Sequence, residues 1–390
     1  MILKPFQKRT WAEIDLNAAT YNYNVIRKQI KKGTKLCCVV KANGYGHGAV
    51  QLSKLYERLG AEYLAVSNIE EGIQLRKANV RLPILILGYT DPRCAELLAE
   101  NNISQCVFSH EYGVKLSEYA VKSNSVVNIH IKMDTGMGRI GFPCNLDAWN
   151  RIINVCSLPG VRHEGIFTHF SVADEGNAGK LYTEAQYDKF RSSVAFLKEH
   201  GIHFSLKHCA NSAGIFDYPD MQIDMVRAGI VLYGLQPSDL LHTPSDLHPI
   251  LSLKTIIDHI KNVKPGDSIS YGREFRASHD MRVATIPIGY ADGLWRSNFR
   301  NHMLFSVEGR YAPLIGRVCM DQCMIDVSNI PTAIIDSEVL VYGGKGRVSV
   351  DQIARINNTI NYEIVCAIGE RVPRIYKKDG NIIEIVDNLM

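Results

Sequence analysis

The sequence lacks the features that mark several protein classes. Its ten cysteines include no C-x-x-C pair, so neither a zinc-ligand spacing nor a disulfide framework is present. No apolar run approaches the roughly 20 residues that a membrane span requires. Residues 1–15 mix Lys, Arg, Glu and Asp and contain no apolar signal core. We therefore expect a reduced, cytoplasmic protein with no metal site and no membrane span.

Charge of one sign is also scarce. Forty-four basic residues nearly balance 40 acidic ones, which leaves a net charge of +4. The basic residues are spread along the chain, so we do not expect nucleic-acid binding. Hydrophobic residues make up 46% of the chain and charged residues 22%, a balance typical of globular proteins. The length of 390 residues is more than one core usually organises, which predicts two domains.

One pattern repeats eight times between residues 36 and 234: a short apolar run, a polar turn and a segment with helical periodicity. The apolar runs are 36–40, 63–66, 84–87, 104–108, 126–132, 164–168, 204–207 and 225–227, the last leading into 229–233. Such alternation indicates parallel strands joined by crossover helices. Eight units predict a (β/α)8 TIM barrel. The alternative, an open doubly wound sheet, lacks a G-x-G-x-x-G after its first strand.

A different texture follows the barrel pattern. Strand-like runs separated by turns predict a mainly β domain, with one helix at 350–356. These runs are 251–259, 268–271, 282–287, 303–307, 323–327 and 338–342. Three prolines between residues 237 and 249 indicate a linker, and residues 10–16 alternate like a strand that lies outside the barrel. The expected division is an N-terminal strand (1–16) associated with the second domain, a barrel (17–240) and a mainly β C-terminal domain (241–390).

Polar and cationic residues occur at five of the predicted strand ends. They are Lys41, Lys132, His169, His208 and Arg227. The carboxyl ends of barrel strands meet at one rim, so we expect these side chains to converge. A rim rich in Lys, Arg and His beside a glycine-rich turn predicts a site for an anionic group such as a phosphate.

Lys41 ends an apolar strand, and three glycines follow it within seven residues. Desolvation lowers the pKa of a lysine, and a neutral amine is what Schiff-base chemistry requires. The segment fits equally a lysine that extends to solvent beside a tight turn. Both interpretations stay open from this segment alone.

Nine segments resemble motifs of the alanine racemases, in the order of that family. They are VVKANGYGHG, KMDTGMGR, THFSVAD, HCANSAG, VRAGI, SYGREF, IGYADG, GRVCMDQ and YEIVCAIGERVPR. The resemblance extends from Trp11 to Arg374. It implies a fold type III enzyme, dependent on pyridoxal 5'-phosphate (PLP), that interconverts L- and D-alanine and supplies D-alanine for peptidoglycan.

The resemblance implies two bases on opposite faces of the substrate Cα. Lys41 would carry the cofactor and act on one face, and Tyr271 of the partner subunit would act on the other, since inversion needs a proton removed from one face and delivered to the other. His169 corresponds to the histidine that hydrogen-bonds this tyrosine. Arg227 corresponds to the arginine that faces the pyridine nitrogen, and His208 to the histidine bonded to it. Without the resemblance, Tyr271 would be interpreted as a half-buried aromatic residue at a strand end.

The resemblance also implies two binding sets and one modified residue. The cofactor-binding set is Lys41, Tyr45, Arg139, His169, Asn211, Ser212, Arg227, Gly229, Ile230 and Tyr362. The substrate-binding set is Arg139, Met320, Asp321 and Tyr290. Lys132 corresponds to a lysine that is carbamylated in many members and so becomes an anion able to hold Arg139. Because Tyr271 lies beyond the barrel and Lys41 within it, the resemblance implies a head-to-tail homodimer with shared sites.

Three alternative functions are compatible with parts of this sequence. A serine or broad-specificity racemase would use the same chemistry, although the bulk of Tyr362 favours alanine. A decarboxylase of basic amino acids would carry a Glu where Arg227 stands. A non-enzymatic PLP-carrier protein of the single-barrel type would lack the second domain. Substrate breadth, carbamylation of Lys132, dimer affinity and a biosynthetic or catabolic role are left open by the sequence.

Overall fold

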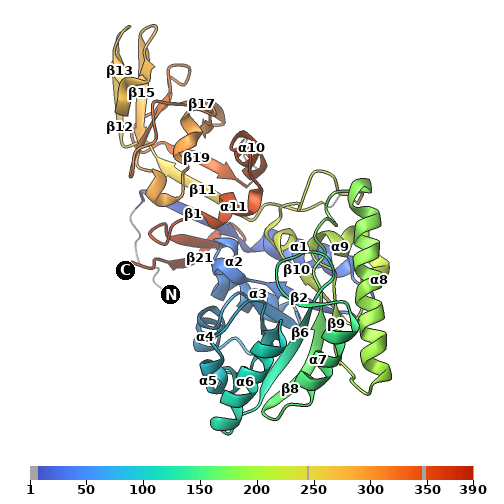
Figure 1. Cartoon of the computed structure of the whole chain (residues 1–390). Helices are drawn as coiled ribbons and strands as arrows, with labels where there is room; N and C mark the ends of the chain where they lie inside the picture. The colour runs from blue at the N-terminus through green and yellow to red at the C-terminus, as the bar shows by residue number, and fades with distance from the viewer. Residues whose placement is uncertain (1–7, 244–245, 345–347, 390) are drawn as a thin grey trace.

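The chain forms a barrel lobe and a β-rich lobe, which lie side by side in Figure 1. The computed structural model describes residues 8–243, 246–344 and 348–389. Parts of two expected segments, the start of the chain and the linker at 237–249, therefore lie outside the described residues. None of the helices within the described ranges is long and apolar enough to cross a membrane.

Eight parallel strands form the barrel, in the order β10–β2–β3–β4–β5–β6–β8–β9. They are β2 (Lys35–Val39), β3 (Tyr63–Val66), β4 (Ile84–Ile86), β5 (Ile103–Val107), β6 (Val127–Asp134), β8 (Val161–Phe167), β9 (Leu206–His208) and β10 (Met225–Ala228). β10 pairs with β2, and the backbone N–H of Arg227 donates to the carbonyl of Ala210 at 3.0 Å, which brings β9 beside β10. All eight predicted runs contribute a strand, so the barrel prediction is confirmed.

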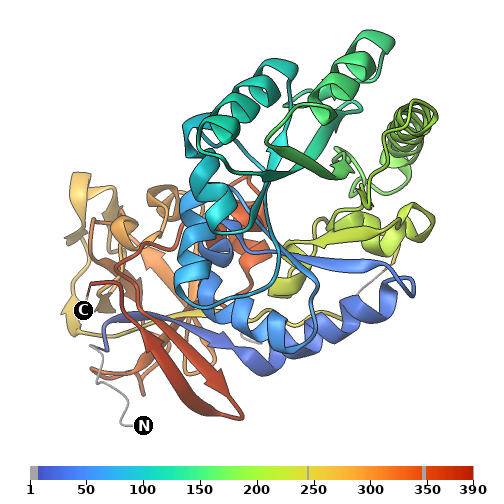
Figure 2. The ribbon, with the colours of Figure 1, turned by 90° about the horizontal axis from the view of Figure 1, so that it is seen from below.

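Helices surround the barrel strands, as the view from below shows (Figure 2). The longer ones are α1 (Leu16–Gln29), α3 (Ala49–Arg58), α4 (Ile69–Lys77), α6 (His110–Lys122), α7 (Leu146–Cys156) and α8 (Asn177–Glu199), and the short ones are α5 (Ala95–Glu100) and α9 (Ser212–Asp217). Asp15, Asn68, Ser109 and Asn145 each accept a backbone hydrogen bond at the start of a helix. Such caps stabilise a helix by about 1 kcal/mol each, so local sequence sets these boundaries.

The β-rich lobe is built on a ten-stranded sheet that also contains the N-terminal strand. In order, its strands are β12 (His259–Val263), β15 (Met281–Ile286), β18 (Cys323–Asp326), β17 (Arg310–Ile315), β16 (Leu304–Val307), β19 (Glu338–Gly343), β11 (Leu251–Ile256), β1 (Thr10–Asp15), β20 (Arg374–Lys378) and β21 (Asn381–Val386). β1 pairs with β11 in antiparallel and with β20 in parallel orientation. The prediction of a mainly β C-terminal domain is confirmed.

Three local predictions for these lobes need correction. Residues 229–233 do not extend strand β10, because the backbone turns at Gly229 into the 3-10 helix η3 (Ile230–Tyr233). The run 251–259 is two strands, since the chain leaves its pairing with β19 and joins β15 instead. Tyr271 ends no strand, because Ser270 adopts a φ of 67° and the chain enters the short helix η4 (Tyr271–Arg273).

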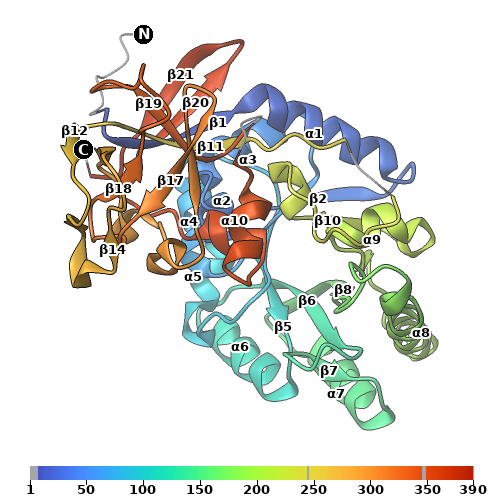
Figure 3. The same cartoon turned by 90° about the horizontal axis from the view of Figure 1, so that it is seen from above.

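Two short helices connect the lobes near the barrel mouth. The predicted helix is present as α10 (Val350–Ile356), and a second helix, α11 (Asn361–Cys366), was not expected. Figure 3 shows α10 above the side of the barrel where α2 (Lys41–Tyr45) lies. Val365 of α11 belongs to the same buried cluster as the barrel residues.

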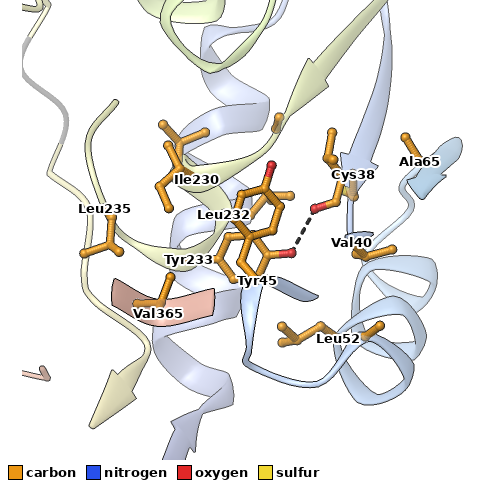
Figure 4. Packing of buried hydrophobic residues seen from close by; sticks show 14 of the residues in the cluster. Cys38, Val40, Tyr45, Leu52, Ala65, Ile230, Leu232, Tyr233, Leu235 and Val365 are labelled. Carbon is orange, nitrogen blue, oxygen red and sulfur yellow. Dashed lines mark hydrogen bonds between the residues drawn. The ribbon is translucent and has the colours of Figure 1, made fainter. Parts of the chain in front are cut away.

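The buried cluster beneath this junction holds two tyrosine rings together. The ring centroids of Tyr45 and Tyr233 lie 4.7 Å apart, and the hydroxyl of Tyr233 donates to the carbonyl of Val39 at 2.8 Å. Figure 4 shows Tyr45 and Tyr233 among Ile230, Leu52 and other apolar side chains. The core therefore holds Tyr45 in place from below.

Candidate active site

A cavity of about 810 Å³ lies at the carboxyl ends of the barrel strands, with α11 residues on its wall. Barrel enzymes place their chemistry at this end. Eleven of the residues singled out in the sequence line it: Lys41, Tyr45, Lys132, Arg139, His169, Asn211, Ser212, Arg227, Gly229, Ile230 and Tyr362. The expected convergence of five strand ends is present, apart from His208, which lies behind Arg227.

Lys41 begins an unusual turn directly after β2. Residues 42–45 all have positive φ angles, between 50° and 61°, which makes α2 a left-handed turn. Side-chain-bearing residues pay about 1 kcal/mol or more each for this conformation, so the surroundings must hold it. The carboxylate of Glu71 accepts from the backbone N–H of Ala42 at 2.6 Å and helps to do so. The strain is concentrated beside Lys41, the lysine that the resemblance assigns to the cofactor.

The surroundings of Lys41 favour its neutral form. Burial lowers the pKa of its amine, and the positive charge of Arg139 lowers it further, while Cys366 and Glu71 act in the opposite direction. A neutral amine is the nucleophilic and basic form of lysine. Cys366 and Glu363 also line the cavity. Both stand in the segment YEIVCAIGERVPR, but their residue types carried no signal by themselves.

Hydroxyl groups converge at one end of the cavity. The hydroxyl of Ser212 accepts from the backbone N–H of Gly229 at 2.9 Å. A Cβ added at Gly229 would lie 2.9 Å from the hydroxyl oxygen of Tyr45, so only glycine leaves this space open. The rings of Tyr45 and Tyr362 lie 6.0 Å apart. Three hydroxyls and a backbone turn around an open space are a donor set that suits an oxyanion such as a phosphate.

Arg227 lies within the barrel, with its side chain almost fully buried. One nitrogen, Nη1, lies 2.8 Å from Nδ1 of His208, the contact that the resemblance implied. The other, Nη2, donates to the carbonyls of Thr168 and Cys209 and lies 3.2 Å from Nδ1 of His169. Burial lowers the pKa of Arg227 to about 10, so the guanidinium keeps its charge at neutral pH.

Hydrogen bonding also determines which nitrogen of His169 carries its proton. A guanidinium has no lone pair to offer, so Nδ1 of His169 must accept from Arg227 and the ring proton resides on Nε2. Burial and the surrounding cations lower the pKa of His169 well below its usual value. The neutral ring therefore has a donor, Nε2–H, for a group outside this contact.

Lys132 is a second lysine with an unfavourable environment for charge. It is only 3% exposed, and its amine donates to the carbonyl of Met133 at 2.7 Å. Burial, together with the charges of Arg227 and Arg139, lowers its pKa to about 8. The ring of Phe167 lies beneath both Lys132 and Arg227, at 5.6 and 5.4 Å from the two cationic groups. Phe167 was missed because an apolar strand residue gives no sign of a cation contact.

The remaining predicted residues lie outside this cavity. Tyr271, Met320 and Asp321 line a second cavity of about 360 Å³ in the β-rich lobe, and the backbone N–H of Tyr290 donates to the adjacent Cys319 carbonyl. Tyr271 is 66% exposed. Within one chain, the structure does not bring Tyr271 together with Lys41.

A charged group missed by the sequence reasoning holds the second cavity in place. Arg371 pairs with Asp321 at 2.7 Å and with the fully buried Asp292 at 2.8 Å, and Arg9 also pairs with Asp292 at 3.0 Å. Arg371 and Asp292 lie in the segments YEIVCAIGERVPR and IGYADG. Their position in those motifs was the only available signal. Asp321 is thus held at the cavity mouth by residues from distant parts of the chain.

Known proteins resemble this chain along almost its whole length. Residues 14–237 match the alanine racemase N-terminal domain, and residues 250–376 match the alanine racemase C-terminal domain. A curated alanine racemase from Clostridium tetani is 45% identical over 378 residues, which cover 96% of this chain and 97% of that protein.

Solved structures agree with this comparison. The structure of an alanine racemase from Clostridium difficile 630 has a TM-score of 0.95 and 39% identity, covering 99% of this chain and 100% of that one. The alanine racemase of Bacillus anthracis with bound L-Ala-P has a TM-score of 0.93 and 36% identity, covering 99% of each chain. The chain belongs to the alanine racemase family.

Proposed function

We propose that this chain interconverts L- and D-alanine with pyridoxal 5'-phosphate, through one base from each of two subunits. The single observation that carries the proposal is the cavity of Lys41, where an amine of lowered pKa shares one cavity with three hydroxyl groups and a buried guanidinium. Membership of the family removes the basis for the decarboxylase and carrier alternatives. The proposal includes a cytoplasmic location and supply of D-alanine for peptidoglycan.

The residues that line the cavity suit the chemical groups of the cofactor. Tyr45, Ser212, Tyr362 and the backbone at Gly229 would hold the phosphate, because they surround an open space that a Cβ would fill. Ile230 and Asn211 complete that end of the cavity. When bound, the cofactor withdraws the electron pair left on Cα after proton removal.

Lys41 would tether the cofactor and work as the base on one face of the substrate. Burial lowers the pKa of its amine, which favours the unprotonated form that accepts a proton at Nζ. The strained turn after Lys41 limits the freedom of its backbone. A base that is already held in place loses less entropy on reaching the reactive orientation, which lowers the reaction barrier.

Tyr271 of the partner subunit would be the base on the opposite face. Its exposure in the single chain, beside Met320 and Asp321, is what a group has when its reaction partner lies on another molecule. The Nε2–H of His169 would donate to the oxygen of that phenol, which stabilises the phenolate form. Tyr290 would border the path by which substrate arrives. We therefore propose a head-to-tail homodimer in which each site uses two chains.

Arg227 would donate to the pyridine nitrogen rather than protonate it. A guanidinium with a pKa of about 10 is a poor acid at neutral pH, so negative charge would remain nearer to Cα. That arrangement favours return of a proton to Cα over side reactions at the cofactor. Arg139 would contact the substrate carboxylate and the cofactor's phenolic oxygen, and the backbone N–H of Met320 of the partner subunit would donate to the same carboxylate.

Lys132 would be carbamylated. With a pKa of about 8, its neutral amine is accessible near pH 7 and attacks the carbon of CO₂; a C–N bond forms, one proton leaves to solvent, and a carbamate anion results. The anion would pair with Arg139 and replace a repulsion between two cations. Intact mass and ¹³C NMR after equilibration with labelled bicarbonate test the modification.

Specificity for alanine over serine would come from the size of the pocket beside Tyr362. The assay is kcat/KM of the purified protein for L-alanine, D-alanine and L-serine, together with its ultraviolet–visible spectrum. We expect alanine to exceed serine and a visible band from bound cofactor. A ratio at or below one would assign the protein to the serine or broad-specificity racemases.

We also propose the division of the chain into residues 1–16, 17–240 and 241–390, which limited proteolysis tests.

A further inference from the structure

Three hydrogen bonds lead from Arg227 through the interior of the barrel to a carboxylate. Nη1 of Arg227 lies 2.8 Å from Nδ1 of His208, and Nε2 of His208 lies 3.0 Å from Nδ1 of His130. Nε2 of His130 lies 3.2 Å from Oε2 of Glu164. Both imidazoles are completely buried. The four side chains come from β10, β9, β6 and β8, so only the closed barrel assembles them.

Arg227, His208, His130 and Glu164 form a hydrogen-bonded relay. The guanidinium of Arg227 determines every proton position along this relay. A guanidinium only donates, so Nδ1 of His208 must accept and its ring proton must lie on Nε2. That proton points at Nδ1 of His130, which must also accept, so the proton of His130 lies on Nε2 and points at Glu164. Protonating Nδ1 of either ring would set two donors against each other. Both imidazoles are therefore neutral and both are Nε2–H tautomers.

The far end is built to receive these donors. The same oxygen of Glu164 accepts from the hydroxyls of Tyr63 and Ser104, each at 3.0 Å. Together with the His130 bond, these contacts lower the pKa of Glu164 to about 2. The carboxylate is therefore ionised throughout the physiological range.

A local irregularity of β8 directs Glu164 to this position. Pairing with β6 matches Ile129 to His163 and His130 to Gly165, so Glu164 is an extra residue without an opposite partner. Such a bulge changes the face to which a side chain points. A Cβ on Gly165 would lie 2.3 Å from Nδ1 of His130, so a glycine is needed for the imidazole to fit.

Arg227 needs a distant carboxylate because its contacts in the described part of the chain include none. Its guanidinium bonds to two neutral imidazoles and two carbonyls, although it is almost fully buried. A buried cation without an anion is costly. The relay aligns every donor toward Glu164, and aligned dipoles convey its negative potential to Arg227.

We propose that Glu164 is a positioning residue for Arg227, acting through His130 and His208, which it holds as neutral Nε2–H tautomers. The effect on catalysis rests on the proposed function, in which Arg227 faces the pyridine nitrogen. The proton arrangement does not rest on it, since it follows from the side chains alone.

Neutron diffraction from deuterium-exchanged holoenzyme crystals tests the arrangement directly. We expect deuterium on Nε2 of both His130 and His208 and none on Nδ1 of either. Deuterium on Nδ1 of His208, or on both nitrogens of one ring, would overturn the proposal. This readout is independent of activity, so it holds even if the protein proves to racemise another amino acid.

Two substitutions test the positioning role. Glu164→Leu removes the acceptor, and we expect kcat for alanine to fall about tenfold, the lower range for groups that support a binding residue, with KM within about twofold. The visible band of the cofactor should shift, since Glu164 no longer fixes the two imidazoles that position Arg227. Glu164→Gln keeps an acceptor oxygen for Nε2–H of His130 but loses the negative charge, so it should recover part of kcat and part of the band position.

Tyr63→Phe is the matched control, because it removes one donor to Glu164 and leaves the relay intact. It should leave the visible band unchanged. A folded Glu164→Leu enzyme with wild-type kcat and band would refute the positioning role. If that variant does not fold, Glu164→Gln and the neutron map decide: a Gln variant as impaired as Lys41→Ala, or a misplaced deuteron, would refute it. A wild-type enzyme inactive on alanine but with the expected deuterons would count against the proposed function only.

Discussion

The two cavities of this chain differ in how complete they are. The barrel cavity is the more enclosed of the two, and within it Lys132 is held by a carbonyl and Arg227 by an imidazole. The cavity of the β-rich lobe is shallow, and Tyr271 and Met320 are more than half exposed beside it. Burial within one chain shifts the pKa values of the groups in the first cavity. The groups of the second cavity are exposed, and the described part of their own chain provides no surface that covers them. The comparison indicates two complementary half-sites.

Removing the barrel half should have the largest effect. Lys41→Ala removes both the cofactor tether and one base, so we expect kcat to fall by on the order of 10⁴-fold or more. The visible band of the bound cofactor should disappear. Spectra and racemisation rates of the purified variant measure both. A retained band would remove Lys41 from its proposed role.

Removing the hydroxyl of Tyr271, in the half-site of the β-rich lobe, should reduce activity less than removing Lys41. The loss should be larger for L-alanine than for D-alanine. Tyr271→Phe deletes the acidic hydroxyl but keeps the ring, so we expect a loss of about 10²–10³-fold in proton removal from L-alanine, in the range for a general base. Loss from D-alanine should be smaller, as measured by exchange of the α-proton in D₂O. Equal and mild losses from both enantiomers would contradict two separate bases.

Mixing the two variants tests whether the halves belong to different chains. A hybrid dimer of Lys41→Ala and Tyr271→Phe chains has one site with both native residues and one with neither. Random exchange at equal amounts should restore about a quarter of wild-type activity for a head-to-tail dimer. Mixing Lys41→Ala with the double variant is the control and should restore nothing. Failure to recover activity after verified subunit exchange would place both bases in one chain.

A smaller effect is expected from the second lysine of the barrel. Lys132→Met removes the amine that would be carbamylated, and Arg139 loses its proposed anionic partner. We expect kcat/KM for alanine to fall about tenfold, mainly through KM, since Arg139 would contact the substrate carboxylate. Depleting CO₂ should weaken the wild type in the same way but leave Lys132→Met unchanged. Equal sensitivity of both enzymes to CO₂ would rule out the carbamate.

The smallest effect on activity, and a measurable one on stability, concerns His47. Burial lowers its pKa to about 4, while its Nδ1 contacts the carbonyl of Tyr45 at 2.7 Å. Below about pH 6.5 the unfolded chain binds a proton that the folded chain refuses, so stability is complete above that pH and falls as the pH drops toward 4. The full loss is about 3 kcal/mol.

Urea unfolding between pH 4 and 7 measures this dependence. His47→Gln should flatten the pH slope, and His279→Gln, at an exposed loop of the other lobe, should not. A slope unaffected by His47→Gln would assign the acid sensitivity to other groups. The difference between the barrel lobe and the β-rich lobe would then not include the effect of a buried histidine on stability.

Prediction from sequence succeeded where short-range signals repeat. The eight apolar runs predicted eight barrel strands because parallel strands buried on both faces are continuously apolar, as Leu36–Val39 illustrates. It failed where a strand changes partners, as after Ile256, because pairing depends on distant segments. The helix Asn361–Cys366 was missed because six residues are too few for a periodic pattern.

The candidate site divides in the same way. Order and chemistry of the motifs identified the family and the residues that line the barrel cavity. Sequence spacing contained no sign of Arg371 holding Asp321, of Phe167 beneath two cations, or of the bulge at Glu164.

The amino-acid sequence by itself determined the inventory: eight β/α units, a β domain, and the order of lysine, arginine, histidine and tyrosine along them. Only the tertiary structure decided which of these share a cavity, which nitrogen of His130, His169 and His208 faces a hydrogen-bond donor, and that Tyr271 stays outside the site of its own chain. The reason is physical. Strand and helix formation depend on neighbours in sequence, whereas pKa, tautomer and exposure depend on groups brought close by barrel closure, tens to hundreds of residues apart.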